Sequence, residues 1–265
     1  MNDSEVPNPS PSEVVSQQGA EIKPLYRGIW ADEIKNGDKI PVGGHALSDE
    51  LDIFMQVDTE WLDEAAKKFT KENVDSAFVN GNEKIFSDWI VDHGGNLDPE
   101  LFHNLFQVQK TMERVLKVDD ADPAQRIRRD KYLDNDTIPK LSDFVGSAEC
   151  VEKAVVGKLL LDKLGVRSTV MSGVHLDDPS DDPGDHTFLV LDEENAEGSI
   201  VFDIARPKAS LDGYPRIMRT NNKVTYDTFR DENNLVVPAR DIYDGKVLNY
   251  GVGNRYLDQV VQIAA

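Results

Sequence analysis

Cysteine is nearly absent from this chain, because its 265 residues include only Cys150. A single thiol cannot form a disulfide within the chain, so an internal disulfide framework is excluded as a source of stability. This usage fits a reducing compartment, and we expect a cytoplasmic protein. With 39% hydrophobic residues, the chain can bury a core that stabilises the fold without cross-links.

Basic residues are also scarce. Lysine and arginine number 29 against 49 aspartates and glutamates, which leaves a formal net charge of −20. A protein that binds nucleic acid needs a basic surface against the phosphates, so we expect no nucleic-acid partner. The simplest interpretation of the acidic excess is solubility, and the alternative is a basic substrate or partner.

Long apolar runs are missing as well. No stretch approaches the roughly 18–20 apolar residues that a membrane-spanning helix needs, so we expect no membrane association. Residues 1–22 have neither the basic nor the apolar part of a secretory signal. They are polar, acidic and rich in proline and serine, which predicts a disordered tail.

The region from residue 23 to 142 is expected to form a helical N-terminal subregion. Apolar residues at helical spacing predict one helix over 60–69, with Asp58 or Thr59 as its cap. A second helix is predicted within 97–118. Its N-cap would be Asp98, because Pro99 suits the first helical position.

The region from residue 143 to 265 has a different pattern and is expected to be the catalytic core. A helix from Ser147 to Leu164 is predicted to end at Gly165, with Lys158 and Asp162 facing solvent. Alternating apolar residues then predict strands within 166–174, 186–192, 199–205, 216–220, 223–229 and 246–253. Helices followed by one helix and an antiparallel run of strands indicate the α+β class.

Three residues with complementary chemistry occur in this second region. Cys150 lies in the first turn of the predicted helix, and His186 and Asp203 lie on two predicted strands. The first turn of a helix directs unpaired N–H groups and the positive end of the helix dipole at the sulfur, which favours the nucleophilic thiolate. A thiol, an imidazole and a carboxylate are the groups that a cysteine nucleophile needs.

A predicted hairpin gives a geometric test of this idea. If residues 193–198 form its loop, Asp192 faces Ser199 and Asp203 lies opposite Phe188. His186 and Asp203 then share one face of the sheet as diagonal neighbours, within reach of each other. A shift of the register by one residue would place them on opposite faces.

Each of the three residues also has an ordinary structural interpretation. Cys150 could be a small buried apolar residue, since free cysteines often are. His186 could be a histidine at the edge of a loop, and Asp203 a charge at a strand end that binds Arg206. Taken together, their order, their predicted elements and their spacing favour a catalytic triad.

The segment around these residues resembles the transglutaminase-like superfamily of papain-type cysteine enzymes. The resemblance rests on C-x-E-x-A at Cys150, LLLDKLGVRSTVMSGV, H-x-F-x-V at His186 and F-D at Asp203, and it covers roughly residues 143–207. It implies a transglutaminase-like fold in which a cysteine-bearing helix packs on an antiparallel sheet. It also implies that Cys150 is the nucleophile, His186 the base and Asp203 the acid that orients the imidazole.

Such an enzyme would transfer an acyl group through a thioester on Cys150, using no cofactor and no metal. Water as the acceptor gives a protease, amidase or deamidase, which we favour, and an amine acceptor gives a transglutaminase. Either would act on a protein or peptide substrate. Two alternatives remain: an inactive binding or scaffold protein with the same fold, and an arylamine-type acetyltransferase with the same triad.

An acidic segment precedes the histidine. Residues 175–186 contain five aspartates, whose oxygens would suit calcium, but their spacing is not that of an EF-hand loop. A solvated acidic loop is therefore the default interpretation, and we expect no metal there. As a lid beside His186, the loop could also select a cationic substrate.

Overall fold

The structure is a computed structural model that describes residues 29–42, 54–67, 97–118, 138–175, 185–192, 196–208, 214–227 and 235–252. The predicted tail over 1–22 lies outside these residues. The helices are α1 (Glu60–Lys67), α4 (Pro99–Leu116) and α6 (Cys150–Lys163), with a short 3-10 helix η2 (Leu141–Phe144). The strands are β1 (Trp30–Ala31), β2 (Lys39–Pro41), β3 (Phe54–Gln56), β4 (Thr169–His175), β5 (Asp185–Leu191), β6 (Ile200–Lys208), β7 (Tyr214–Thr220), β8 (Leu235–Asp241) and β9 (Val247–Val252).

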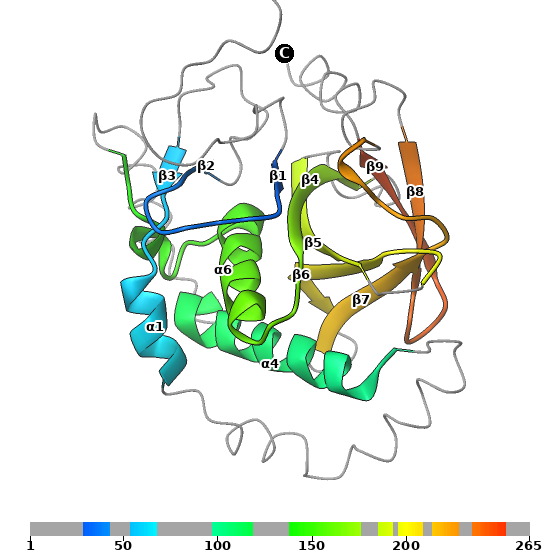
Figure 1. Ribbon diagram of the computed structural model, residues 1–265, viewed down its shortest axis with the longest axis horizontal. Helices are drawn as coiled ribbons and strands as arrows, with labels where there is room; N and C mark the ends of the chain where they lie inside the picture. The colour runs from blue at the N-terminus through cyan, green and yellow to red at the C-terminus, as the bar shows by residue number, and fades with distance from the viewer. Residues whose placement is uncertain are drawn as a thin grey trace, which may run out of the picture.

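Seven of the strands form one antiparallel sheet in the order β1-β4-β5-β6-β7-β8-β9. Strand β4 also pairs with β9, where Val174 lies opposite Gly251 and His175 opposite Tyr250. This pairing joins β4 through β9 into a closed, curled sheet, and the helices gather on one side of it (Figure 1). The predicted α+β class and the antiparallel run are therefore confirmed.

The curled sheet separates two apolar clusters. One fills its interior and includes Phe188 from β5, Val201 from β6 and Tyr250 from β9. The other lies between the sheet and the helices. It includes Leu189, which follows Phe188 in the sequence, and Phe202, which follows Val201. Successive residues of a strand face opposite sides of a sheet, so this alternation decides which side chains of β5 and β6 point inward.

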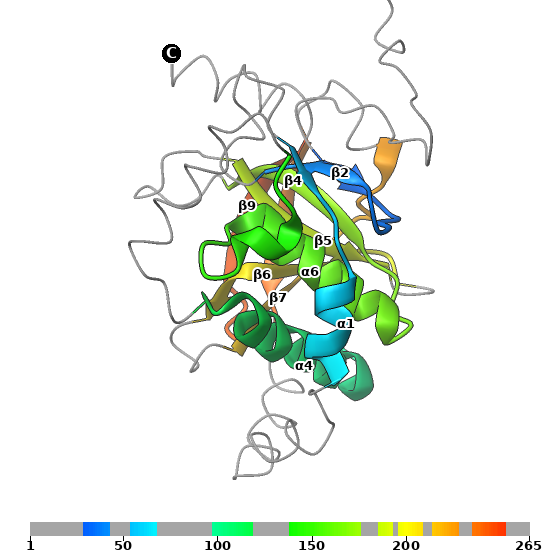
Figure 2. The same ribbon diagram turned by 90° about the vertical axis from the view of Figure 1, so that its left-hand side faces the viewer.

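Helix α6 is buried between the sheet and α4, with α1 on the same side of the sheet (Figure 2). Gly157 allows this close approach, because a Cβ there would lie 2.5 Å from Cδ1 of Ile204 on β6. The expectation that Lys158 faces solvent is wrong. Its side chain is buried along the packed helix, and its Nζ reaches Asp162 at 2.7 Å, on the exposed side of the last turn.

The caps of the two earlier helices follow from the sequence. Asp98 caps α4 as predicted: its carboxylate accepts hydrogen bonds from the N–H groups of Glu100 at 2.7 Å and Leu101 at 3.4 Å. At α1 the Thr59 carbonyl accepts the N–H of Asp63 at 3.0 Å. The neighbouring Asp58 does not bond to its own helix backbone, because its carboxylate bonds to the N–H and the hydroxyl of Ser142.

Some expectations differ from the fold. The region from 23 to 142 contains strands β1, β2 and β3 besides its helices, and β1 pairs with β4 of the main sheet. The strand expected over 223–229 is wrong in its described part, because Tyr226 and Asp227 are helical. The N–H of Val224 there bonds to the Ser199 hydroxyl at 3.0 Å, not to a strand. Strand β8, which contains Pro238, was not expected.

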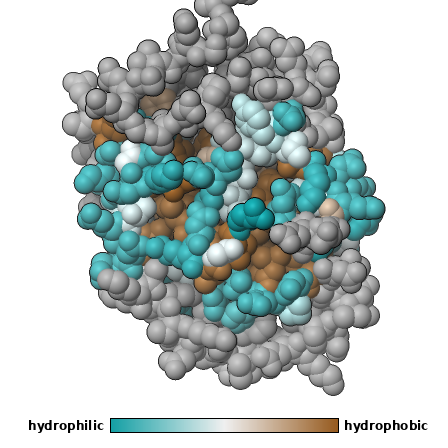
Figure 3. Space-filling model, in the orientation of Figure 1, coloured by the Kyte–Doolittle hydropathy of each residue, from teal (hydrophilic) through white to brown (hydrophobic). Residues whose placement is uncertain are grey.

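Apolar side chains appear in the middle of the face drawn in Figure 3, over the region where the helices meet the sheet. Polar side chains lie to either side of them. Within the residues described, no helix has the length and apolarity needed to cross a bilayer.

Candidate active site

Cys150 is the first residue of α6 and is partly exposed. The expectation that Ser147 caps this helix is wrong, because Gly146 turns the chain at φ +85° and the Ser147 hydroxyl lies 3.4 Å from the Phe144 carbonyl. Glu149 is the N-cap instead, and its N–H bonds to the Glu152 carboxylate at 2.7 Å. The Cys150 side chain therefore projects from the first residue of α6.

The first hydrogen bond within α6 runs from the N–H of Lys153 to the carbonyl of Glu149. The N–H groups of Cys150, Val151 and Glu152 therefore precede the helical hydrogen-bond ladder and lie at the positive end of the helix dipole. A negative charge that develops beside Cys150, on sulfur or on a substrate oxygen, is stabilised at this position.

His186 and Asp203 are in direct contact. Nε2 of His186 lies 2.8 Å from Oδ1 of Asp203, with 4% of the histidine and 0% of the aspartate exposed. The register of the β5–β6 hairpin is the predicted one, since Leu191 pairs with Ile200 and Leu189 with Phe202. Both side chains consequently lie on the inner face of the curled sheet, as the alternation requires.

The imidazole is held in its charged form. Burial by itself lowers the pKa of His186, but the charge and hydrogen bond of Asp203, with smaller contributions from Cys150, raise it from 6.5 to about 9. Burial opposes the charge of Asp203 as well, yet the His186 charge and hydrogen bond lower the pKa of that carboxyl below its ordinary value. The two groups form a buried ion pair across neutral pH.

Cys150 acts on the same imidazole, because its side chain contributes to the raised pKa of His186. Because Nε2 of His186 bonds to Asp203, Nδ1 is the ring nitrogen that is left to interact with a thiol. The structure thus brings together the three side chains that the sequence singled out, from the start of α6, the start of β5 and the middle of β6.

Two further residues border the pair and were missed by the sequence reasoning. The hydroxyl of Tyr250 on β9 donates to Oδ2 of Asp203 at 3.4 Å, and burial raises the pKa of Tyr250 well above its usual value, so the phenol keeps its proton. Arg216 on β7 pairs with Asp203 in register. Once the positions of β7 and β9 in the sheet are known, the alternation of side chains along each strand shows that both residues face inward. The sequence did not predict the order of the strands.

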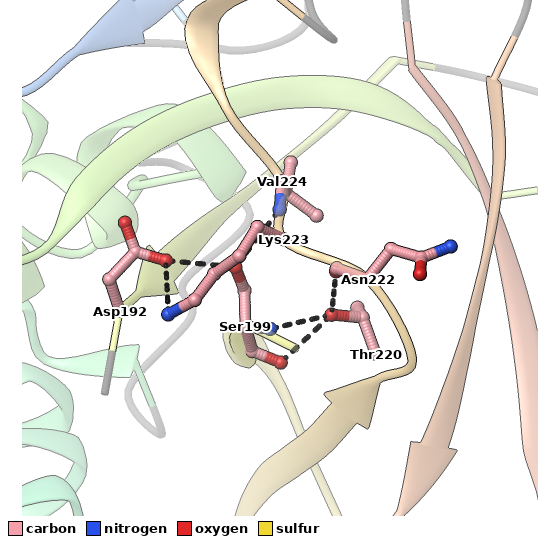
Figure 4. A network of polar contacts seen from close by, with 6 residues as sticks. All are labelled: Asp192, Ser199, Thr220, Asn222, Lys223 and Val224. Carbon is pink, nitrogen blue, oxygen red and sulfur yellow. Dashed lines mark hydrogen bonds and ion pairs between the residues drawn. The ribbon is translucent and has the colours of Figure 1, made fainter. Parts of the chain in front are cut away.

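The register of the hairpin is secured at its far end by a polar network (Figure 4). The Ser199 hydroxyl donates to Asp192 at 2.9 Å and accepts the N–H of Val224, while the Ser199 N–H donates to the Thr220 hydroxyl at 2.8 Å. Lys223 reaches the same Asp192 oxygen at 3.5 Å. These contacts tie β5, β6 and the end of β7 to one another.

Gly198 adds a steric condition to the same turn. A Cβ at this position would lie 1.8 Å from the backbone oxygen of Thr220, well inside contact distance. Only glycine allows the two chains to approach so closely. The alignment of β5 with β6, and with it the approach of His186 to Asp203, therefore depends on this turn.

Metal ligands do not gather in the described ranges, where no group of three or more His, Cys, Asp or Glu residues could hold an ion. Most of the acidic segment over 175–186, including residues 176–184, lies outside those ranges. The calcium alternative and the proposed lid both fall on that segment.

No family model, no curated protein and no solved structure matches this chain. The resemblance to transglutaminase-like enzymes rests on the sequence segments around Cys150, His186 and Asp203.

Proposed function

We propose that this protein is a cysteine-dependent acyl-transfer enzyme that acts on an amide bond of a protein or peptide substrate. The observation that carries the proposal is the buried His186–Asp203 pair, whose imidazole is held protonated and interacts with Cys150. An imidazolium beside a thiol stabilises the thiolate, which is the nucleophilic form of cysteine.

The reaction would proceed in two stages. In the first, the Cys150 thiolate attacks the carbonyl carbon, and the oxyanion that forms faces the N–H groups in the first turn of α6. The C–N bond then breaks as His186 gives its proton to the leaving amine, which leaves a thioester on Cys150. Asp203 holds the imidazole in orientation and stabilises its charge throughout.

In the second stage an acceptor resolves the thioester. Water loses a proton to His186 and attacks the carbonyl, which releases the acid and restores the thiolate. An amine acceptor would instead form a new amide, as in transamidation. We favour hydrolysis, because it needs no site for a second substrate.

We also propose that the fold is transglutaminase-like. A cysteine at the start of a helix packed on an antiparallel sheet, with histidine and aspartate on adjacent strands, supports this assignment. The helix–sheet packing through Gly157 is consistent with it, since it brings the start of α6 to the strands that carry the other two groups.

The test is the pH dependence of iodoacetamide labelling at Cys150. A thiolate–imidazolium pair predicts fast labelling at about pH 6, at least roughly tenfold faster than in His186→Ala. His103→Ala, a histidine substitution on α4, is the matched control and should label like the wild type. Labelling with an ordinary thiol profile in every variant would point to a non-catalytic binding protein.

A second experiment measures substrate turnover directly. Cleavage of peptide and glutamine-containing substrates should disappear in Cys150→Ala, whose thermal unfolding should match that of the wild type, because a partly exposed thiol contributes little packing. Full turnover in Cys150→Ala would contradict the mechanism.

A further inference from the structure

Arg216 places a second positive charge at the candidate active site. It lies on β7 directly opposite Asp203 on β6, and directly paired residues of neighbouring strands project from the same face of a sheet. Its charge contributes to the lowered pKa of Asp203 and acts on Tyr250 as well. Arg216 is therefore adjacent to the aspartate that binds His186.

Among the residues that the structure describes, no hydrogen-bond acceptor for the Arg216 guanidinium is found. Its Nε is buried without a hydrogen-bond partner among the residues that the structure describes, while the side chain as a whole is half-buried. The two oxygens of Asp203 already interact with His186 and Tyr250. Leaving a buried donor of a charged group unpaired is costly, so an acceptor supplied by a ligand would be bound favourably there.

Arg216 is a positive charge beside the reacting groups of a chain that is strongly negative overall. The negative charge of Asp203 is already offset by the imidazolium of His186, so Asp203 is not a dedicated counter-ion for Arg216. An arginine fork matches the two oxygens of a carboxylate, and a partly desolvated site strengthens the pairing.

We propose that Arg216 binds a carboxylate of the substrate next to the amide bond that Cys150 attacks. This inference rests on the proposed function and specifies its substrate class as acidic. It differs from the basic substrate suggested by the net charge of −20, because the charges beside the reacting atoms act on the substrate group far more strongly than distant surface charges do.

Two alkylating probes of similar size test the subsite. Iodoacetate carries a carboxylate beside its reactive carbon, and iodoacetamide carries a neutral amide in the same place. The ratio of their labelling rates at Cys150 reports attraction of the carboxylate and divides out any change in the reactivity of the thiol. Replacing the cation by a neutral side chain in Arg216→Gln should lower this ratio roughly five- to tenfold.

Two variants serve as controls. Arg216→Lys keeps the charge and should retain most of the ratio, which separates charge from packing. Arg219→Gln removes the same charge from the same strand, but its parity places residue 219 on the opposite face, so its ratio should change less than about twofold. Thermal unfolding of all three variants verifies that each is folded.

The results separate this proposal from the proposed function. Fast, His186-dependent iodoacetamide labelling with a ratio that is equal in the wild type and Arg216→Gln overturns the carboxylate subsite and leaves the enzyme proposal standing. A lowered ratio in Arg216→Gln that Arg216→Lys restores supports the subsite. Slow labelling that ignores His186 overturns the proposed function, and the subsite with it.

The position of the carboxylate on the substrate follows from protection experiments. N-acetylglutamate α-amide carries the charge on a side chain, and N-acetylalanine carries it at a chain end. The compound that slows iodoacetamide labelling of the wild type more than of Arg216→Gln identifies the position. If neither compound discriminates between the two proteins, the subsite is overturned as a binding site.

Discussion

Tyr250 and Asp203 meet inside the curled sheet, where the phenol of Tyr250 lies 3.4 Å from Oδ2 of the carboxylate whose Oδ1 binds His186. The contact spans strands β9 and β6, which are far apart in the sequence. It exists because the pairing of β4 with β9 closes the sheet. The same ring packs against Phe188 with centroids 4.8 Å apart, and Phe188 in turn neighbours His186.

The first prediction concerns this contact. Removing the hydroxyl in Tyr250→Phe leaves the aromatic packing but deprives a buried carboxylate of a donor, which should lower the free energy of unfolding by about 1–3 kcal/mol. If Tyr250 positions Asp203, the pH midpoint of Cys150 labelling should shift as well. Denaturant unfolding and labelling on one protein preparation measure both effects.

A control for this experiment is Tyr243→Phe, which removes a buried hydroxyl that donates to the Pro215 carbonyl at 2.8 Å, not to the active-site pair. It should cost stability without moving the labelling midpoint. An equal shift of the midpoint in both variants would mean that Tyr250 has no specific role toward Asp203.

The second prediction is the pH dependence of stability. The folded-state pKa of His186 is raised from 6.5 to about 9, so its ion pair stabilises the fold fully below pH 6.5. As the pH rises through 9, the proton is lost and this contribution disappears, at a cost on the order of 3 kcal/mol. Denaturant unfolding between these pH values measures the decline.

His186→Gln should flatten that decline, since glutamine does not titrate. On the acid side Asp203 acts in the opposite sense: its lowered pKa stabilises the fold above the ordinary carboxyl value of 3.8, and this contribution is lost as the pH falls toward the folded-state value. A wild-type stability that stays level through the alkaline range would contradict the ion pair.

The third prediction concerns the turn that sets the β5–β6 register. Gly198→Ala would place a Cβ 1.8 Å from the Thr220 backbone oxygen, so the backbone must move and the hairpin must shift or open. We expect a loss of stability of about 3 kcal/mol or more, the size associated with severe local strain. Because the register aligns His186 with Asp203, His186-dependent labelling of Cys150 should fall as well.

Gly37→Ala is the control for the steric contact, because Gly37 has a positive φ of +94° but nothing lies within 4 Å of its Cβ position. It should show only the strain of an alanine at positive φ, about 1–2 kcal/mol, with normal labelling. Retention of wild-type stability in Gly198→Ala would show that the turn tolerates a different register.

Local chemistry made part of this fold predictable. Asp98 and Pro99 start α4 because an aspartate accepts orphan N–H groups and proline needs none at the first helical position. The hairpin register followed from its turn length and from the alternation of apolar residues, and it placed His186 and Asp203 on one face. Each of these signals lies within a few residues of what it determines.

The remaining features depend on contacts between distant segments. No strand was expected over 235–241, a segment that contains Pro238, yet β8 pairs with β9, and the exposed proline there lies opposite Asn249 in register. Ser147 had the chemistry of a cap, but its hydroxyl lies against the preceding turn, which Gly146 directs by bonding to the Leu116 carbonyl of α4. The position of Ser147 therefore depends on how α4 packs, which the local sequence does not show.

The sequence by itself determined the α+β class, the starts of α1 and α4 and the shared face of His186 and Asp203, because capping and side-chain alternation act locally. Tertiary structure alone decided that the sheet closes on itself, that Tyr250 and Arg216 join the pair, and that Cys150 acts on the imidazole. Those contacts depend on which strands become neighbours and on how closely α6 approaches β6 at Gly157, and burial of apolar surface over the whole chain sets both.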